Sequence, residues 1–381
     1  MNKDRNQGNT FSGGDNNKFL KRKFKKTKEN EKYIINNNIE FFSNPKGINF
    51  YKNITEDSYS NLYSLDNTFT VFNSINDILY LIYSNKIRSI ISYNLIENKK
   101  IIEIKDAHED SITNFRYYLD KINKIDFILS ISYYNNNIKI WKINNWECIY
   151  DYKDINKDGY LYTACFLNDN NNNYIITSNC NNIDLSEPIK IFDFNGNKMK
   201  EINDSNYKSF FIDSYYDYKS NKNYIISANE NSIKSYDYKE NKLYHNYPND
   251  IVDDNLIHIS LIIFDDNKII KLIESNNNTQ NDKSSIRIWN FHSGILLNEI
   301  MLDDLSFGIC LWNNQYLFVG CENNIIKLIE LKNGKIKMLN DKTDEDEKII
   351  TIKKIIHPIY GECLLSQGLR NNQIKLWINK D

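Results

Sequence analysis

The sequence predicts an all-β fold, a seven-bladed β-propeller of four-stranded antiparallel blades that is closed by an N-terminal strand. A four-residue pattern of Ile, a basic residue, any residue and a large apolar residue occurs seven times. Successive copies begin 40 to 53 residues apart, which is the period of a propeller blade. Helical spacing of apolar residues is nowhere sustained between them. The copies are Ile87–Ile90, Ile138–Trp141, Ile189–Phe192, Ile233–Tyr236, Ile286–Trp289, Ile326–Ile329 and Ile374–Trp377.

The chain begins with a polar arm, residues 1–45, which we separate from a propeller at residues 46–381. The arm carries a basic run from Lys18 to Lys28. Such a run is most often a solvated tail, and the alternative is a nuclear-import signal or a contact with an acidic surface.

The first predicted strand, Ile48–Ile54, is apolar and aromatic and has no partner near it in the sequence. The last blade has only three predicted strands, around Ile349–Ile356, Glu362–Gln367 and Ile374–Ile378. A propeller must close to hide its strand edges. We therefore expect the N-terminal strand to complete the last blade.

Each repeat between these ends divides into four short strands, for example Leu256–Phe264, Lys268–Glu274, Ile286–Asn290 and Ile295–Leu302. The first strand of most blades has apolar residues at i, i+3 and i+5, and we expect them to face the central channel and the following blade. These sets are Ile112, Phe115, Tyr117; Leu161, Ala164, Phe166; Ile259, Ile262, Phe264; and Phe307, Cys310, Trp312. Asn195-Gly196, Ser293-Gly294 and Asn333-Gly334 follow the repeated strand, where a tight turn needs positive φ.

These repeats resemble those of WD-repeat (Trp-Asp repeat) β-propellers, and the chain is similar to a divergent member of that family over residues 48–381. The family signature is Gly-His, then Gly-Ser with a turn Asp, then a strand that ends in Trp-Asp. Its remnants here are Ala107-His108 with Asn135 and Trp141, Phe192-Asp193, Tyr236-Asp237, Ile329-Glu330, and Gly320-Cys321 with Asn323. Because the buried His, Ser, Asp and Trp network is complete in no blade, we expect apolar stacking to contribute more than in typical members.

Composition limits the classes of function. A net charge of −2 argues against a protein that coats nucleic acid. No apolar run is long enough to span a bilayer and the N-terminus is polar, so we expect an intracellular protein, cytoplasmic or nuclear, with no membrane partner. The six cysteines show no Cys-x-x-Cys spacing, which predicts buried free thiols and no zinc site.

No catalytic motif is recognisable, and we expect neither an enzyme nor a cofactor. The five histidines are scattered over different blades. Asp154, Asn156, Asp158 and Gly159 match the first half of a calcium loop, but its twelfth position is Cys165, which cannot supply the bidentate Glu. An ordinary turn is the better interpretation, and no metal site is predicted.

Two functions fit these observations. The first is a non-catalytic scaffold or adaptor in a larger complex that presents a propeller face to peptide segments of partner proteins, as the WD-repeat resemblance implies. The alternative is a subunit of an RNA-containing particle, with the basic arm as its anchor.

The connections between blades are rich in carboxylates, whereas the turns after the repeated strand carry lysines. A ring of carboxylates attracts cationic segments and repels phosphate backbones, so basic peptides are the expected partners. Asp is also a common turn residue, which leaves a purely structural interpretation open. The predicted binding residues are Glu109, Asp110, Asp158, Asp253, Asp254, Asp303, Asp304, Asp344, Glu345, Asp346 and Glu347.

Overall fold

The computed structural model describes Pro45 and residues 48–55, 58–59, 67–86, 88–153, 159–169, 172–181, 188–203, 209–229, 232–248, 256–266, 268–278, 283–339, 347–370 and 373–379. Within these residues the regular structure is 28 strands in seven four-stranded antiparallel sheets. The basic arm and the motif Asp154–Asp158 lie outside the described residues. No helix in the described part of the chain could span a bilayer.

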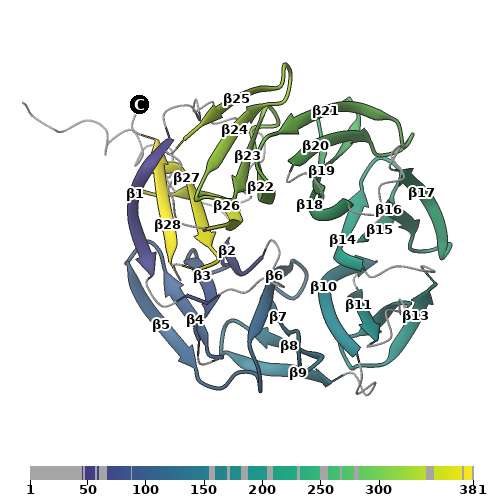
Figure 1. Ribbon diagram of the computed structural model, residues 1–381. Helices are drawn as coiled ribbons and strands as arrows, with labels where there is room; N and C mark the ends of the chain where they lie inside the picture. Colours follow the sequence, from purple (N-terminus) through teal and green to yellow (C-terminus); the bar gives the residue numbers. More distant parts are fainter. Residues whose placement is uncertain are drawn as a thin grey trace, which may run out of the picture.

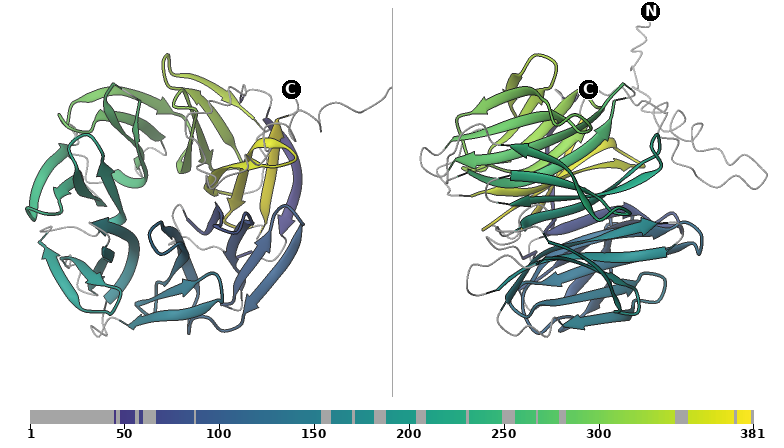
Figure 2. Two further views of the ribbon diagram at one scale, coloured as in Figure 1. Left: turned by 180° about the vertical axis from the view of Figure 1, so that it is seen from behind. Right: turned by 90° about the vertical axis from the view of Figure 1, so that its right-hand side faces the viewer.

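The sheets are the blades of a ring, as predicted, and Figures 1 and 2 show the first strand of each blade nearest the axis. Blade 1 is β2 (Phe69–Asn73), β3 (Leu79–Ser84), β4 (Ile90–Asn94) and β5 (Lys99–Ile104). Blade 2 is β6 (Ile112–Asp120), β7 (Ile125–Ser132), β8 (Asn137–Lys142) and β9 (Glu147–Lys153). Blade 3 is β10 (Gly159–Asp169), β11 (Asn172–Asn181), β12 (Ile189–Asp193) and β13 (Lys198–Ile202). Blade 4 is β14 (Ser209–Asp217), β15 (Lys222–Asn229), β16 (Ser232–Asp237) and β17 (Lys242–Pro248).

The remaining blades repeat this order from the axis outwards. Blade 5 is β18 (Leu256–Asp265), β19 (Ile270–Asn278), β20 (Lys283–Asn290) and β21 (Leu296–Leu302). Blade 6 is β22 (Ser306–Trp312), β23 (Tyr316–Cys321), β24 (Ile326–Glu330) and β25 (Lys335–Met338). Blade 7 is β26 (Ile349–His357), β27 (Gly361–Gly368), β28 (Ile374–Asn379) and β1 (Ile48–Thr55).

The predicted ring closure is confirmed. Strand β1 pairs antiparallel with β28 from Ile48 opposite Asn379 to Thr55 opposite Ile374. Ile48 is buried, and the Phe50 ring meets Trp377 edge to face at 5.6 Å. Figure 1 shows β1 as the outer strand beside β28. The N-terminal strand thus covers an edge that β28 would otherwise expose.

The repeated pattern lies on the third strand of six blades, but the first copy, Ile87–Ile90, is wrong by three residues. The third strand of blade 1 begins at Ile90, and Arg88 lies before it with a φ of 64°. The equivalent segment is Ile90–Tyr93, because its register shift between Ser92 and Tyr93 matches the shift between the last two pattern residues in blades 2 to 5. The pattern matched too early because Ile stands at both position 87 and position 90, and Ile90 served as its last residue instead of its first.

The expected orientation of the first strands holds in two blades and is wrong in two. Ile262 and Phe264 pack against blade 6, and Cys310 and Trp312 against blade 7, each the following blade. Ile112, Phe115 and Tyr117 pack against blade 1, and Leu161, Ala164 and Phe166 against blade 2, each the preceding blade. Both faces of a first strand are buried between blades, so apolar spacing cannot say which neighbour a face meets.

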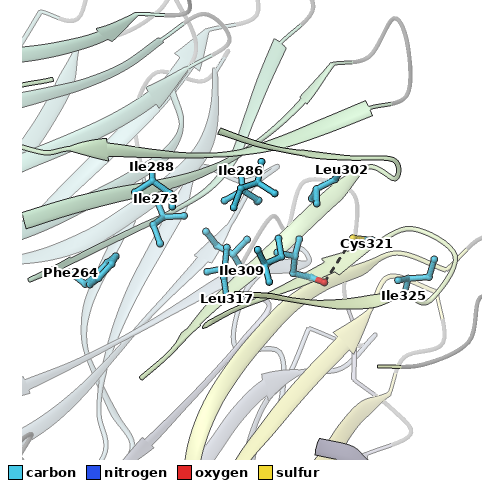
Figure 3. Close-up of a cluster of buried hydrophobic side chains, with 12 residues drawn as sticks. Phe264, Ile273, Ile286, Ile288, Leu302, Ile309, Leu317, Cys321 and Ile325 are labelled. Atoms are coloured by element: carbon cyan, nitrogen blue, oxygen red, sulfur yellow. Dashed lines mark hydrogen bonds between the residues drawn. The ribbon is translucent and has the colours of Figure 1, made fainter. Parts of the chain in front are cut away.

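The core is a series of apolar layers between successive blades, and Figure 3 shows the layer between blades 5 and 6. Ile273, Ile286 and Ile288 contribute from blade 5, and Ile309 and Leu317 from blade 6. The three predicted Gly turns are confirmed by φ values of 86° at Gly196, 66° at Gly294 and 69° at Gly334. Cys165, Cys310, Cys321 and Cys363 are buried thiols as predicted, whereas Cys148 on the outer strand β9 is exposed.

Candidate interaction surface on the connection face

Strand direction decides which loops share a face of the ring. Neighbouring strands in every blade are antiparallel. The connections between blades therefore emerge on the same face as the turns between second and third strands, and we name it the connection face. The other turns lie on the opposite face. In blade 2 the connection face combines residues 105–111 with the turn at residues 133–136.

The predicted acidic residues do not form a uniform set. Glu109 and Asp303 are exposed, Asp110 and Asp304 are half-buried, and Glu347 is buried. The other six lie outside the described residues: Asp158, Asp253, Asp254, Asp344, Glu345 and Asp346.

Glu109 differs from the other described carboxylates of this set because it is exposed, forms an ion pair and borders a cavity. Its side chain is 68% exposed and forms an ion pair with Lys153. The hydrogen bond with Glu109 raises the pKa of Lys153 above its usual value. Next to this pair is a small cavity of about 60 Å³ that is lined by polar and charged residues. The lining residues are Glu109, Asn135, Asn137, Lys139, Asp151 and Lys153, and Lys139 Nζ lies 3.1 Å from Asp151 Oδ2.

The other described carboxylates contribute more to the fold. Asp304 Oδ2 lies 2.6 Å from Nζ of the buried Lys327. Glu347 Oε1 accepts a hydrogen bond from the Arg370 amide at 2.9 Å. Asp110 Oδ1 accepts one from the Ser111 amide at 2.6 Å. Asp303 remains exposed at the surface. Among the described carboxylates, the negative charge of this face is therefore concentrated at fewer exposed positions than the sequence suggests.

Sequence reasoning missed an aromatic group on the connection face. Tyr133 and Tyr134 follow β7, and the Tyr133 ring meets Tyr162 of blade 3 at 5.2 Å. Tyr162 in turn meets Phe210 of blade 4 at 5.1 Å. Tyr134 is 48% exposed and directly precedes Asn135 of the polar cavity.

The same position on the first strand is occupied by large apolar residues in the blades that follow. Ile259, Phe307 and Ile350 occupy the position equivalent to Phe210 in blades 5 to 7 and form one buried cluster. An alignment of the starts of the first strands could have revealed this ring of positions, since Tyr, Phe or Ile recurs there in five successive blades.

A buried hydrogen-bond chain supports this surface in blade 2. Trp141 Nε1 donates to Ser130 Oγ at 2.9 Å, and Ser130 Oγ lies 2.7 Å from His108 Nε2. Burial, together with the charge of Lys139, lowers the pKa of His108 to about 3. His108 is therefore neutral near pH 7, and the Ser130 hydroxyl links its Nε2 to the Trp141 indole.

The equivalent hydrogen-bond chain has fewer members in blades 5 and 7. Trp377 Nε1 donates to Ser366 Oγ at 2.9 Å in blade 7. In blade 5 the position of this serine is taken by Glu274, which stands opposite Arg287 as Ser130 stands opposite Lys139. The Trp289 Nε1 atom is buried and has no hydrogen-bond partner.

Neither a scan against protein-family models nor a search of curated proteins found a match for this chain. The assignment of its surface consequently rests on the geometry described above.

Proposed function

We propose that this protein is a divergent WD-repeat propeller that acts as a non-catalytic interaction scaffold, and that its connection face binds Lys- or Arg-rich segments of partner proteins. The seven-bladed architecture and the His108–Ser130–Trp141 chain support the family assignment.

The observation that carries the proposed partner chemistry is the Glu109–Lys153 pair. An ammonium group of the chain itself already contacts this exposed carboxylate beside a polar cavity. A basic side chain of a partner can take the place of Lys153 with the same charge and hydrogen-bonding capacity. The exposed Tyr134 ring nearby offers a face that suits a guanidinium or an ammonium.

The proposal is tested by two variants with opposite expected effects. Glu109→Gln should weaken the binding of an Arg-rich peptide roughly two- to fivefold, the usual range for an exposed ion pair, and should flatten its salt dependence. Lys153→Met removes the competing ammonium and should strengthen binding by a similar factor. Affinities would be measured by fluorescence anisotropy with one labelled Arg-rich peptide.

Asp303→Asn is the matched control, because it removes an exposed carboxylate of the same face from another blade. A weaker effect than that of Glu109→Gln is expected if the polar cavity directs the peptide. Equal affinities of the wild type, Glu109→Gln and Lys153→Met would contradict the proposal.

The acidic run before β26 stays a prediction, since Asp344, Glu345 and Asp346 lie outside the described residues. Replacing these three by Ser should weaken capture of a basic partner from the native cell. Glu347 should be left intact in that variant, because it is buried and accepts a hydrogen bond from the Arg370 amide.

A further inference from the structure

Arg116 lies on the first strand of blade 2 but reaches past blade 3 to blade 4. Its guanidinium carbon is 5.3 Å from the centre of the Phe211 ring, and its Nη2 donates to the Ile212 carbonyl oxygen at 3.4 Å. Both contacts are on β14, the first strand of blade 4. Arg116 as a whole is partly exposed.

Arg116 forms no ion pair with any described carboxylate. Among the described residues no carboxylate oxygen lies within 4 Å of it, and its Nε is buried with no hydrogen-bond partner. By contrast, Arg88 pairs with Asp106 at 3.3 Å and Arg287 with Glu299 at 2.7 Å. A guanidinium has five N–H donors, and removing it from water without an anion is costly.

Two buried polar side chains on the same level as Arg116 each carry an oxygen without a hydrogen-bond partner. Asn114 is two residues earlier on the same side of β6 and is 4% exposed, and its Oδ1 is unpaired. Thr163 is 2% exposed and occupies the equivalent level of the adjacent first strand β10, and its Oγ1 is unpaired. Buried polar groups are nearly always hydrogen-bonded, to protein or to a bound molecule. Three unsatisfied groups on two adjacent strands indicate that something polar belongs there.

We propose that Arg116, with the Thr163 hydroxyl as a further donor on the adjacent strand, forms an anion site near the axis at blades 2 to 4, and that its ligand is a carboxylate group. The Phe211 ring lies against the guanidinium, and Nη2 donates one hydrogen bond to Ile212, while Nε has no hydrogen-bond partner. The remaining N–H donors of the guanidinium suit the oxygens of a carboxylate, which Arg commonly binds in a bidentate manner.

The charge around the site favours a monoanion over a phosphate. The position equivalent to Arg116 is held in blade 4 by Asp213, in blade 3 by Cys165 and in blade 5 by Ile262. Burial raises the pKa of the Cys165 thiol, the nearby Asp213 charge raises it further, and the Arg116 charge lowers it. A phosphate dianion would meet this second negative charge with only one guanidinium to compensate for it. With a carboxylate the formal charges of Arg116, Asp213 and the ligand sum to −1, whereas with a phosphate dianion they sum to −2.

The test measures the binding of carboxylates to the full chain, detected as a rise in unfolding temperature and by titration calorimetry. Succinate represents a free small carboxylate, and triglycine with a free or an amidated C-terminus distinguishes a peptide carboxylate from the rest of a peptide. Inorganic phosphate and chloride are the competing anions. We expect at least one carboxylate to bind, and amidation to abolish binding of the tripeptide if the natural source is a peptide end.

Arg116→Met keeps the length and apolar packing of the side chain and should weaken carboxylate binding at least tenfold. In the absence of ligand it should change the unfolding temperature little, because the charge that it removes has no ion-pair partner. Arg88→Met, which alters a paired arginine, is the matched control and should bind carboxylates like the wild type.

The inference would be overturned by unchanged binding in Arg116→Met, by stabilisation of the wild type by phosphate but not by carboxylates, or by no effect of any anion, which would indicate that water fills the site. The result is independent of the proposed function, because Glu109→Gln alters the connection face and leaves the Arg116 site intact.

Discussion

The three tryptophans that end the third strand differ in one respect that can be measured. Trp141, Trp289 and Trp377 are equally buried, at 5%, 3% and 4% exposure. Trp141 and Trp377 donate to a serine hydroxyl, whereas the Trp289 indole N–H has no partner. Replacing each by Phe removes the N–H and keeps an aromatic ring, so the three variants separate hydrogen bonding from packing.

The expected free energies follow from these environments. Loss of aromatic surface is similar in all three variants, since their burial is similar. Trp141→Phe and Trp377→Phe also break a buried hydrogen bond, which costs about 0.5–1.5 kcal/mol and more when the partner is left unsatisfied. Trp289→Phe instead removes a buried donor that has no partner, whose desolvation costs about 1–3 kcal/mol. Trp289→Phe should therefore be less destabilising than the other two by about 2 kcal/mol.

The measurement is urea unfolding monitored by far-ultraviolet circular dichroism, because each substitution removes one of the five tryptophans that would report fluorescence. The three Trp→Ala variants provide the scale and should each cost roughly 3–5 kcal/mol as large-to-small core changes. If Trp289→Phe destabilises the protein as much as Trp141→Phe does, the unpaired state of its indole N–H is refuted. Losses below about 1 kcal/mol for all three Ala variants would mean that these rings are not in the core.

Three further predictions concern closure, pH and close packing. Deleting residues 1–45 should leave the unfolding temperature nearly unchanged, whereas deleting residues 1–58 removes β1 and should cause aggregation detectable by light scattering; identical behaviour would argue against closure by β1. The pKa of His108 is about 3 in the folded protein against 6.5 ordinarily, so the unfolded chain binds the proton more readily between these values. The stabilisation is complete above pH 6.5 and is lost on acidification by about 1.4 kcal/mol per pH unit; His108→Gln should remove this part of the slope in urea unfolding between pH 7 and pH 5. Gly308→Ala would place a Cβ 2.7 Å from the Ile350 carbonyl oxygen and should destabilise the protein by at least about 1–3 kcal/mol, which thermal unfolding would show; a neutral effect would mean that blades 6 and 7 are less closely packed.

Several features of this protein are readable from local sequence because they depend on residues close together in the chain. The repeated third strand has a strong pattern, since its alternate residues are buried against neighbouring blades. The turns at Gly196, Gly294 and Gly334 require positive φ, which glycine supplies without steric cost. Closure by β1 could be inferred because the last blade lacked one strand.

The candidate surface was only partly readable. The placement of the carboxylates on the connection face could be inferred from strand direction, and Glu109 and Asp303 are exposed there. The sequence did not reveal that Lys153 pairs with Glu109 or that Glu347 is buried, because those contacts join residues 44 and 23 positions apart. The aromatic group was missed for the same reason, as its members come from three successive blades.

Sequence alone therefore determined the number of blades, the strand order within them and the closing strand, since these follow from a repeat of local patterns and from the need to cover strand edges. Tertiary structure decided the blade that each buried face meets, the start of β4, and the position of Arg116 against β14, 96 residues further along the chain. The physical reason is that the inner strands of a blade are buried on both faces. An apolar residue at either face is equally compatible with the sequence pattern, and only the packing of the closed ring selects its neighbour.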